Sequence, residues 1–335
     1  MITQPLVSVV MPAYNAERYL KEAIDSVLKQ SYSNIELIIV NDGSTDSSKD
    51  IILSYTDPRI HYIENQPNKG IVKSRNIGLE NSAGKYIATL DSDDIALPER
   101  IEMQVKFLEE NPDYGMCGTY HQEIDSKGNL LKKINYPSTD KDARSYLTIG
   151  NCFCASTIMI RSEIAKKLKY KEGYDIVEDY ELWYRVSKMS KIANIPFCTT
   201  QYRVHGNNIT ITKKSHNIER ATKIYREILS DYKINISEEE LAVHVNAIFY
   251  NNIYFGEREK TSQLKKWVVK FYSEIKKNNA LNPAVVHKFL SDKWVVICAK
   301  NRNYKGLIFN PLFTLNKTSY LSVLFNKLTK RTIKY

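Results

Sequence analysis

The stretch Lys85-Tyr86-Ile87-Ala88-Thr89-Leu90-Asp91-Ser92-Asp93-Asp94 joins a short apolar run to three carboxylates. The apolar run is rich in residues that favour strands and is bounded by Gly84, so it predicts a buried strand of a parallel sheet. Ligands of open α/β sheets sit outside the carboxyl ends of such strands. Because one residue separates Asp91 from Asp93, an extended backbone lets their side chains converge on one cation. Such oxygen ligands suit Mg²⁺ or Mn²⁺ shared with substrate phosphates.

The same residues have a second interpretation, which is an aspartate-rich turn before a helix. Pro98 opens an amphipathic stretch soon afterwards, and proline is typical of the first turn of a helix. The stretch by itself does not separate a metal site from a turn. The polar residues that follow the other predicted strands favour the metal site.

Upstream of this stretch, segments typical of strands and helices alternate with short connections between them. Three more strands are expected at 7–11, 35–40 and 60–63. This alternation predicts an α/β fold in which a mostly parallel sheet carries helices on both faces. From about residue 113, short strands mix with helices, which predicts an antiparallel extension for a second substrate. A mainly helical, basic region is expected over 213–335.

The net charge of +10 is concentrated in the last part of the chain. Residues 261–335 hold 15 Lys and Arg against 2 Asp and Glu, so the remaining residues hold 33 against 36. The seven tryptophans and phenylalanines of this region lie among these lysines: Trp267, Phe271, Phe289, Trp294, Phe309, Phe313 and Phe325. This composition predicts contact with an anionic membrane surface. The alternative is a helical domain with aromatics in its core and solvated lysines outside. No nucleic-acid recognition motif accompanies the charge, so no nucleic-acid partner is expected.

Cysteine content and hydropathy bear on where the protein works. The five cysteines are odd in number and scattered, which favours a reducing compartment. The first residues lack the pattern of a signal peptide, and no apolar run approaches the roughly 18 residues that span a bilayer. The expected location is cytoplasmic, or peripheral on the cytoplasmic face of the inner membrane.

A cluster of chemically capable residues follows each of the four predicted strands. The clusters are Pro12-Ala13-Tyr14-Asn15, Asn41-Asp42-Gly43-Ser44-Thr45-Asp46, Asn68 to Asn76, and Asp91 to Asp94. Tyr14 can stack on a base, Asp42 can accept a hydrogen bond from a base or ribose, and Lys73 and Arg75 can meet phosphates near a helix start. Each cluster alone also has a structural interpretation, as loop packing, a helix cap or a solvated helix face.

Further along, Glu178 and Asp179 begin a predicted helix. Carboxylates at a helix N-terminus stay ionised, as a general base requires, although acidic first turns are common in helices of every kind. Trp183 lies one turn later and can serve either as an acceptor platform or as core. His205 can ligate the metal or be structural, and Arg203 can offset leaving-group charge.

Taken in order, these motifs resemble family 2 glycosyltransferases, which have the GT-A fold. The resemblance covers roughly 5–210 and extends through Glu178-Asp179 to Tyr202-Arg203-Val204-His205. It implies that Asp91-Ser92-Asp93 is the DXD motif, with one carboxylate on the ribose and Asp93 on the metal, joined by His205. It further implies nucleotide-sugar binding by Pro12, Tyr14, Asp42, Lys73, Arg75, Asp91, Ser92 and Asp93. Asp179 matches the catalytic aspartate, with Glu178 as its nearest rival and Trp183 toward the acceptor.

The resemblance also implies an activity, which is inverting, Mn²⁺- or Mg²⁺-dependent transfer of a hexosyl or N-acetylhexosaminyl group. The donor is a nucleotide-sugar, most commonly a UDP-sugar, and the acceptor is a glycan or lipid-linked hydroxyl in cell-surface polysaccharide or lipopolysaccharide biosynthesis. Residues 1–112 would then bind the donor, 113–212 the acceptor, and 213–335 would follow as a separate region. Two alternatives stay open. A nucleotidyltransferase usually needs a glycine-rich loop after the first strand, where 12–17 has no glycine, and an inactive nucleotide-sugar-binding protein would not need the retained acidic pair.

Overall fold

The computed structural model describes residues 4–206, 217–249, 258–300 and 312. The chain divides into two compact units. One consists of 1–143 and 151–217, and the other of 144–150 and 218–335. The domain boundary predicted at 212/213 lies outside the described residues. No helix in the described part of the chain is both long and apolar enough to cross a membrane.

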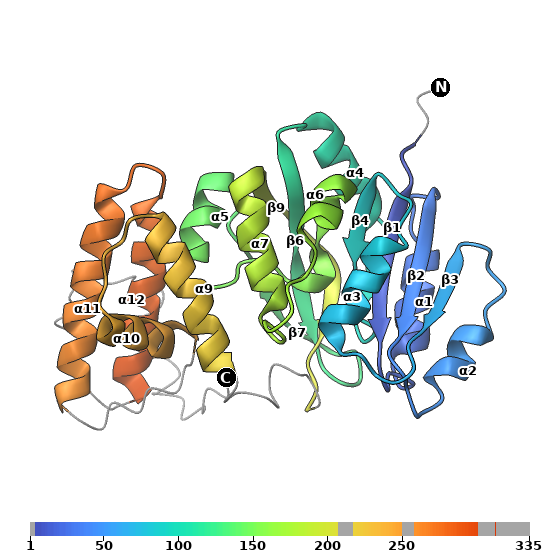
Figure 1. The fold of residues 1–335 in the computed structure, drawn as a ribbon, viewed down its shortest axis with the longest axis horizontal. Coiled ribbons are helices and arrows are strands. Elements are labelled where there is room, and N and C mark those ends of the chain that lie inside the picture. Colours follow the sequence, from blue (N-terminus) through green and yellow to red (C-terminus); the bar gives the residue numbers. More distant parts are fainter. Residues whose placement is uncertain (1–3, 207–216, 250–257, 301–311, 313–335) are drawn as a thin grey trace. The chain divides into compact units, whose positions relative to one another are not determined.

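The first unit is built on one mixed sheet. Its strands are β1 (Val7–Ala13), β2 (Ile35–Asn41), β3 (Ile60–Glu64), β4 (Tyr86–Thr89), β5 (Ile95–Ala96), β6 (Tyr114–Ile124), β7 (Leu130–Ile134), β8 (Met159–Arg161) and β9 (Lys191–Arg203). The strand order is β3-β2-β1-β4-β8-β6-β9-β5, with β7 paired to β6. Figure 1 shows β4, β1, β2 and β3 side by side, and these four strands are parallel. The predicted fold class, α/β with a mostly parallel sheet, is confirmed.

Helices cover both faces of this sheet, as predicted. The helices of the unit are α1 (Leu20–Leu28), α2 (Ser48–Leu53), α3 (Ile71–Glu80), α4 (Arg100–Glu110), α5 (Asp140–Leu147, shared with the second unit), α6 (Ser162–Leu168) and α7 (Glu178–Met189), with a short 3₁₀ turn η1 (Ala155–Thr157). Val9 packs in one core cluster with Leu20 of α1 and Leu108 of α4. Its neighbour Val10 points to the opposite face. There α3 approaches so closely that a Cβ on Gly78 would lie 2.3 Å from Val10 Cγ1.

Strand register brings the predicted clusters to one edge. Ala13 at the end of β1 pairs with Asn41 at the end of β2, and Thr89 at the end of β4 pairs with Val10. Because these strands are parallel, the chain leaves all of them at the same side of the sheet. The loops that carry Tyr14, Asp42 and the aspartates after β4 therefore start at this edge.

The second half of the sheet is only partly as expected. The pairs β4–β8, β6–β8 and β6–β7 are antiparallel, but β6 and β9 run parallel. The prediction of an antiparallel extension is therefore wrong at its longest pairing. Shifts in register interrupt the β6–β9 ladder, and Pro196 lies within β9, so this strand lacks the regular alternation that marks a strand in sequence.

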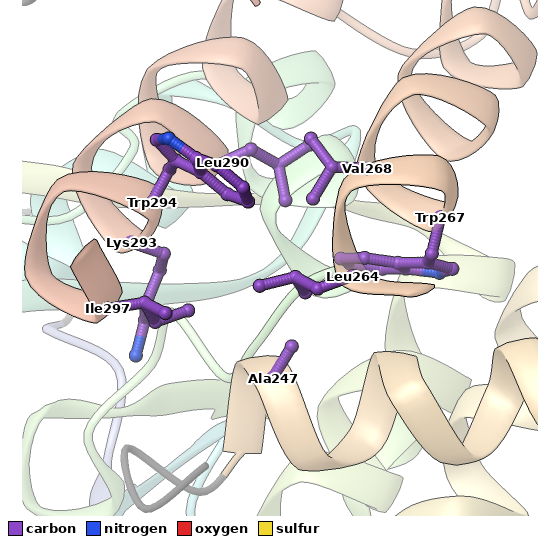
Figure 2. A pocket seen from close by; sticks show the side chains of 8 residues that line it. All are labelled: Ala247, Leu264, Trp267, Val268, Leu290, Lys293, Trp294 and Ile297. Atoms are coloured by element: carbon purple, nitrogen blue, oxygen red, sulfur yellow. The ribbon is translucent and has the colours of Figure 1, made fainter. Parts of the chain in front are cut away.

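The second unit is helical, as predicted for the end of the chain. Its helices are α9 (Asn217–Asp231), α10 (Glu238–Phe249), α11 (Arg258–Lys277) and α12 (Pro283–Lys300). Trp267 and Phe271 are buried and stack at 5.3 Å between ring centroids. Trp294 is buried as well, and Figure 2 shows it with Trp267 at a small apolar pocket lined from α10, α11 and α12. These three aromatics belong to the core, as the alternative interpretation has it. Phe309, Phe313 and Phe325 lie outside the described residues.

Candidate active site

The loop after β4 presents its three aspartates differently. The side chains of Asp91 and Asp93 are 31% and 27% exposed, whereas Asp94 is fully buried and accepts a hydrogen bond from the backbone N–H of Arg203 at 2.8 Å. Burial and the neighbouring Asp93 raise the pKa of Asp94 well above its ordinary value. Burial, then Asp91, also raise the pKa of Asp93, and His205 opposes the shift. Asp91 and Asp93 are thus the two carboxylates that a ligand can reach, with Ser92 half-buried between them.

Asp93 and His205 lie together, as the metal prediction requires. His205 Nε2 is 2.9 Å from Asp93 Oδ2, and the imidazole ring packs on Tyr19 at 5.3 Å between centroids. The carboxylate oxygen suits Mn²⁺ or Mg²⁺, and the imidazole nitrogen beside it favours a transition-metal ion such as Mn²⁺. Within the described residues, no cluster of three or more His, Cys, Asp or Glu side chains could hold a metal ion alone. A cation here would therefore take its remaining ligands from a diphosphate and water.

Arg75 joins this loop to the acidic pair on α7. Its guanidinium is buried, 2.9 Å from Asp91 Oδ1 and 3.1 Å from Glu178 Oε1, and it lies over the ring of Tyr170. Burial acts to lower the pKa of Arg75, but the charges around it, chiefly Asp91, raise it above its ordinary value. The sequence predicts Arg75 at the nucleotide. The structure places it as a fixed cation between two carboxylates.

The two acids at the start of α7 have different environments. Glu178 is only 5% exposed and is ion-paired with Arg75, while Asp179 is half-buried and accepts hydrogen bonds from Asn151 Nδ2 at 3.0 Å and from the backbone N–H of Tyr180. Burial, and then the charge of Glu178, raise the pKa of Asp179 to about 7, so the expectation that the helix N-terminus keeps this carboxylate ionised is wrong below neutral pH. A base with a pKa near neutrality is suited to take a proton from a hydroxyl group. Asp179, rather than Glu178, has both the pKa and the access for this role.

Asp42 is a buried anchor of the loop before α3. Its Oδ1 accepts hydrogen bonds from Asn65 Nδ2 at 2.9 Å and Lys69 N at 2.8 Å, and its Oδ2 accepts one from Gly70 N at 2.9 Å. Gly70 takes a φ of 86°, which favours glycine, so the chain can turn here into α3. The carboxylate orders this loop, and its predicted contact with a base stays a prediction. Lys73 is about half exposed, with Glu172 at 4.0 Å.

The remaining predicted residues divide between surface and core. Tyr14 is 53% exposed directly after β1, where its ring is free to stack, and Pro12 is buried within β1 opposite Val40. Trp183 has no exposed surface and packs edge-on against Tyr170. An acceptor cannot stack on a ring inside the core, so the acceptor platform predicted at Trp183 is wrong.

Arg203 has a different place from the one expected. Its buried guanidinium donates to the backbone carbonyl of Asp93 at 2.9 Å, pairs with Glu22 of α1 at 2.5 Å, and lies 4.4 Å above the ring of Tyr19. It therefore holds the backbone of the loop after β4 and is not directed at a leaving group. Tyr19 and Asn151 are site residues that sequence reasoning missed. Neither carries a local signal, because both act through partners that are distant in sequence.

Known proteins with similar sequences are described as glycosyltransferases. Residues 8–169 match the family described as Glycosyl transferase family 2. An uncharacterized glycosyltransferase of Haemophilus influenzae is 34% identical over 285 residues, covering 82% of this chain and 87% of that protein. Escherichia coli WfgD, named as a UDP-Glc:alpha-D-GlcNAc-diphosphoundecaprenol beta-1,3-glucosyltransferase, is 34% identical over 62% of this chain and 81% of its own.

A solved structure supports the same fold. The mannosyltransferase PcManGT of Pyrobaculum calidifontis, in complex with GDP-Man and Mn²⁺, aligns with a TM-score of 0.57 over 99% of this chain and 89% of that one. Sequence identity is 14%, so this likeness concerns the fold alone. The family match spans the loop after β4 and ends before Glu178 and Asp179.

Proposed function

The chain belongs to glycosyl transferase family 2, and from this membership we propose that it moves a sugar from a nucleotide-sugar to an acceptor hydroxyl with inversion at the anomeric carbon. One observation carries the proposal. A pair suited to a metal, Asp93 and His205, and a base of raised pKa, Asp179, belong to one network, because Arg75 joins Asp91 to Glu178. The buried guanidinium of Arg75 thus links the loop proposed to bind the donor to the helix start proposed to activate the acceptor.

The proposed reaction is a single displacement. Asp179 accepts the proton of the acceptor hydroxyl while the oxygen of that hydroxyl bonds to the anomeric carbon. The bond from this carbon to the diphosphate oxygen breaks, and the nucleoside diphosphate leaves with the electron pair. A divalent cation held by Asp93 and His205 would stabilise the charge on the departing diphosphate. The exposed ring of Tyr14 would stack on the base.

We further propose a UDP-sugar donor and a lipid-linked acceptor in cell-surface polysaccharide biosynthesis. The relative WfgD supports this choice, because its name gives UDP-Glc as the donor and a diphosphoundecaprenol-linked sugar as the acceptor. Such an acceptor is held in a bilayer, so the protein would work at the cytoplasmic face of the membrane. The lysine-rich region 261–335 would favour that surface electrostatically.

A donor screen tests the activity itself. The full chain is incubated with UDP- and GDP-sugars, Mn²⁺ or Mg²⁺, and a lipid-linked saccharide, and the released nucleotide is measured. Acceptor-dependent release of a nucleoside diphosphate is expected. In a parallel incubation with a nucleoside triphosphate and a sugar 1-phosphate, release of pyrophosphate would instead indicate a nucleotidyltransferase. Binding of donor without release in either incubation would indicate an inactive relative.

The metal pair gives a first prediction. We expect His205→Ala to weaken Mn²⁺ binding in the presence of UDP by at least about 10-fold, because one of two protein ligands is lost and even supporting groups are worth 10- to 100-fold. Electron paramagnetic resonance of free Mn²⁺ measures this affinity. The matched control is His61→Ala, since His61 is largely exposed on β3 beside Glu36. Equal Mn²⁺ affinity in both variants would exclude His205 as a ligand.

The pKa of Asp179 gives a second prediction. Because the raised pKa of about 7 keeps this carboxyl protonated in acid, kcat should rise tenfold per pH unit below pH 7 and level off above it. The measurement is kcat at saturating donor from pH 5.5 to 9. A flat profile over this range, with chemistry shown to be rate-limiting, would contradict the assignment of Asp179 as the base.

A further inference from the structure

The hairpin of β6 and β7 exposes apolar side chains beside the site. Leu130 and Leu131 at the start of β7 are 66% and 52% exposed. Because successive residues of a strand point to opposite faces, these two leucines show that neither face of β7 is covered here. β7 pairs with β6 along one edge, and within the described residues no strand pairs with its other edge.

Positive charge accompanies the leucines. From Asp125 to Ile134 the hairpin carries three lysines and one acid, and the lysines are Lys127, Lys132 and Lys133. Lys132 is 60% exposed and lies 3.4 Å from Glu123, whereas Lys133 lies 5.9 Å from the ring centroid of Tyr120. Lysines on an edge strand disfavour pairing with a second protein strand. Leucines that are exposed on both faces of a strand can instead enter the interface of a bilayer, and lysines next to them in the chain can bind its anionic headgroups.

The turn of this hairpin is tied to the active site. The carbonyl of Asp125 accepts a hydrogen bond from Arg203 Nη1 at 3.3 Å, and the carbonyl of Ser126 accepts one from Tyr19 Oη at 3.5 Å. Arg203 also holds the backbone of Asp93, and the ring of Tyr19 packs on His205. One layer of side chains therefore separates the turn from the proposed metal pair.

We propose that the hairpin 125–134 is a lipid-docking element that seats the active site on an anionic membrane surface. Leu130 and Leu131 enter the interface, and the three lysines contact lipid phosphates. This inference rests on the proposed function in so far as a lipid-linked acceptor must reach Asp179 from the bilayer. It assigns membrane contact to the catalytic unit itself, apart from any contribution of 261–335.

Vesicle binding by the full-length chain tests the proposal. Sedimentation compares vesicles of phosphatidylcholine with vesicles containing phosphatidylglycerol, and wild type should prefer the anionic vesicles. L130S/L131S should lower the affinity at least about tenfold through lost apolar burial. K127Q/K132Q/K133Q should lower it about fivefold per lysine, and added salt should weaken wild-type binding but weaken this variant less.

Matched controls lie on other surfaces of the same unit. Leu53→Ser removes a leucine that is 55% exposed on α2, and Lys106→Gln removes a lysine that is 72% exposed on α4. Both should bind anionic vesicles like wild type. Nucleotide release from donor with a short, water-soluble acceptor should be unchanged in the hairpin variants, so loss of docking is separated from loss of the proposed activity.

Three outcomes would overturn the proposal. The first is a failure of wild type to bind anionic vesicles. The second is binding of the hairpin variants to these vesicles with the affinity of wild type. A wild-type dimer that L130S/L131S converts to a monomer would assign the hairpin to pairing between copies of the chain. By contrast, hairpin-dependent vesicle binding by a protein that releases no nucleotide would refute the proposed function and leave the lipid-docking element standing.

Discussion

Asp179→Asn is expected to reduce turnover by about 10²- to 10⁴-fold while leaving donor binding unchanged. Asparagine keeps the size of the side chain and can still accept the hydrogen bond from Tyr180 N, but it cannot take a proton. The measurement pairs kcat for nucleotide release with calorimetric binding of UDP and Mn²⁺. The control is Glu163→Gln, an exposed acid in the first turn of α6, which should keep wild-type turnover.

The same variant has an expected signature in stability. The folded pKa of Asp179 is about 7, against an ordinary value of 3.8, so the folded wild type binds more protons than the unfolded chain between these values. This group therefore makes wild type less stable as pH rises from about 4 to 7. Asp179→Asn should lack that contribution. Its free energy of unfolding in urea, compared with that of wild type at the same pH, should therefore be higher at pH 8 than at pH 4. Lower stability of the variant at both values, with turnover lost, would mean that the residue is structural.

Arg75→Ala should give the largest loss of stability. The substitution leaves the carboxylates of Asp91 and Glu178 without their shared cation, and breaking a buried ion pair costs about 3–5 kcal/mol. Arg75→Lys should recover only part of this, because an ammonium group cannot bridge two carboxylates as a guanidinium does. The free energy of unfolding in urea at pH 7.5 measures both variants.

Two further variants make this expectation specific. Lys73→Ala changes an exposed cation of the same helix and should alter the free energy of unfolding by no more than about 0.5 kcal/mol. Glu178→Gln placed in the Arg75→Ala background should restore part of the lost stability, since it removes one of the unpaired charges. If Arg75→Ala is no more destabilising than Lys73→Ala, the buried bridge does not organise the site.

The first half of the sheet could be predicted because its signals are local. The apolar strand before Asp91 and its acidic ending lie within ten consecutive residues, and the neighbouring strands have the same form. The strand β9 could not be predicted in this way, because its pairing with β6 includes register shifts and its sequence contains polar residues and Pro196. The alternating pattern of a strand reflects regular burial of one face, and β9 departs from this regularity at the register shifts of its pairing with β6.

The roles of individual side chains were harder to predict than their proximity. Asp93 and His205 meet as the family resemblance implied, but Arg75 and Asp42 are held by partners far along the chain, which sequence spacing does not reveal. The sequence allows Trp183 to lie either at the surface or in the core, and only its packing against Tyr170 shows that it is in the core. Asn151 contacts Asp179, yet an asparagine between ordinary loop residues gives no sign of this.

The anomeric configuration of the product tests the central claim most directly. Proton nuclear magnetic resonance of the glycoside, recorded early in the reaction of the full chain with the donor and acceptor found in the screen, reports the configuration at the transferred carbon. A single displacement assisted by Asp179 predicts a configuration opposite to that of the donor. A product with the donor's own configuration would contradict the account, since it requires a route in which Asp179 does not act as the base of one in-line attack.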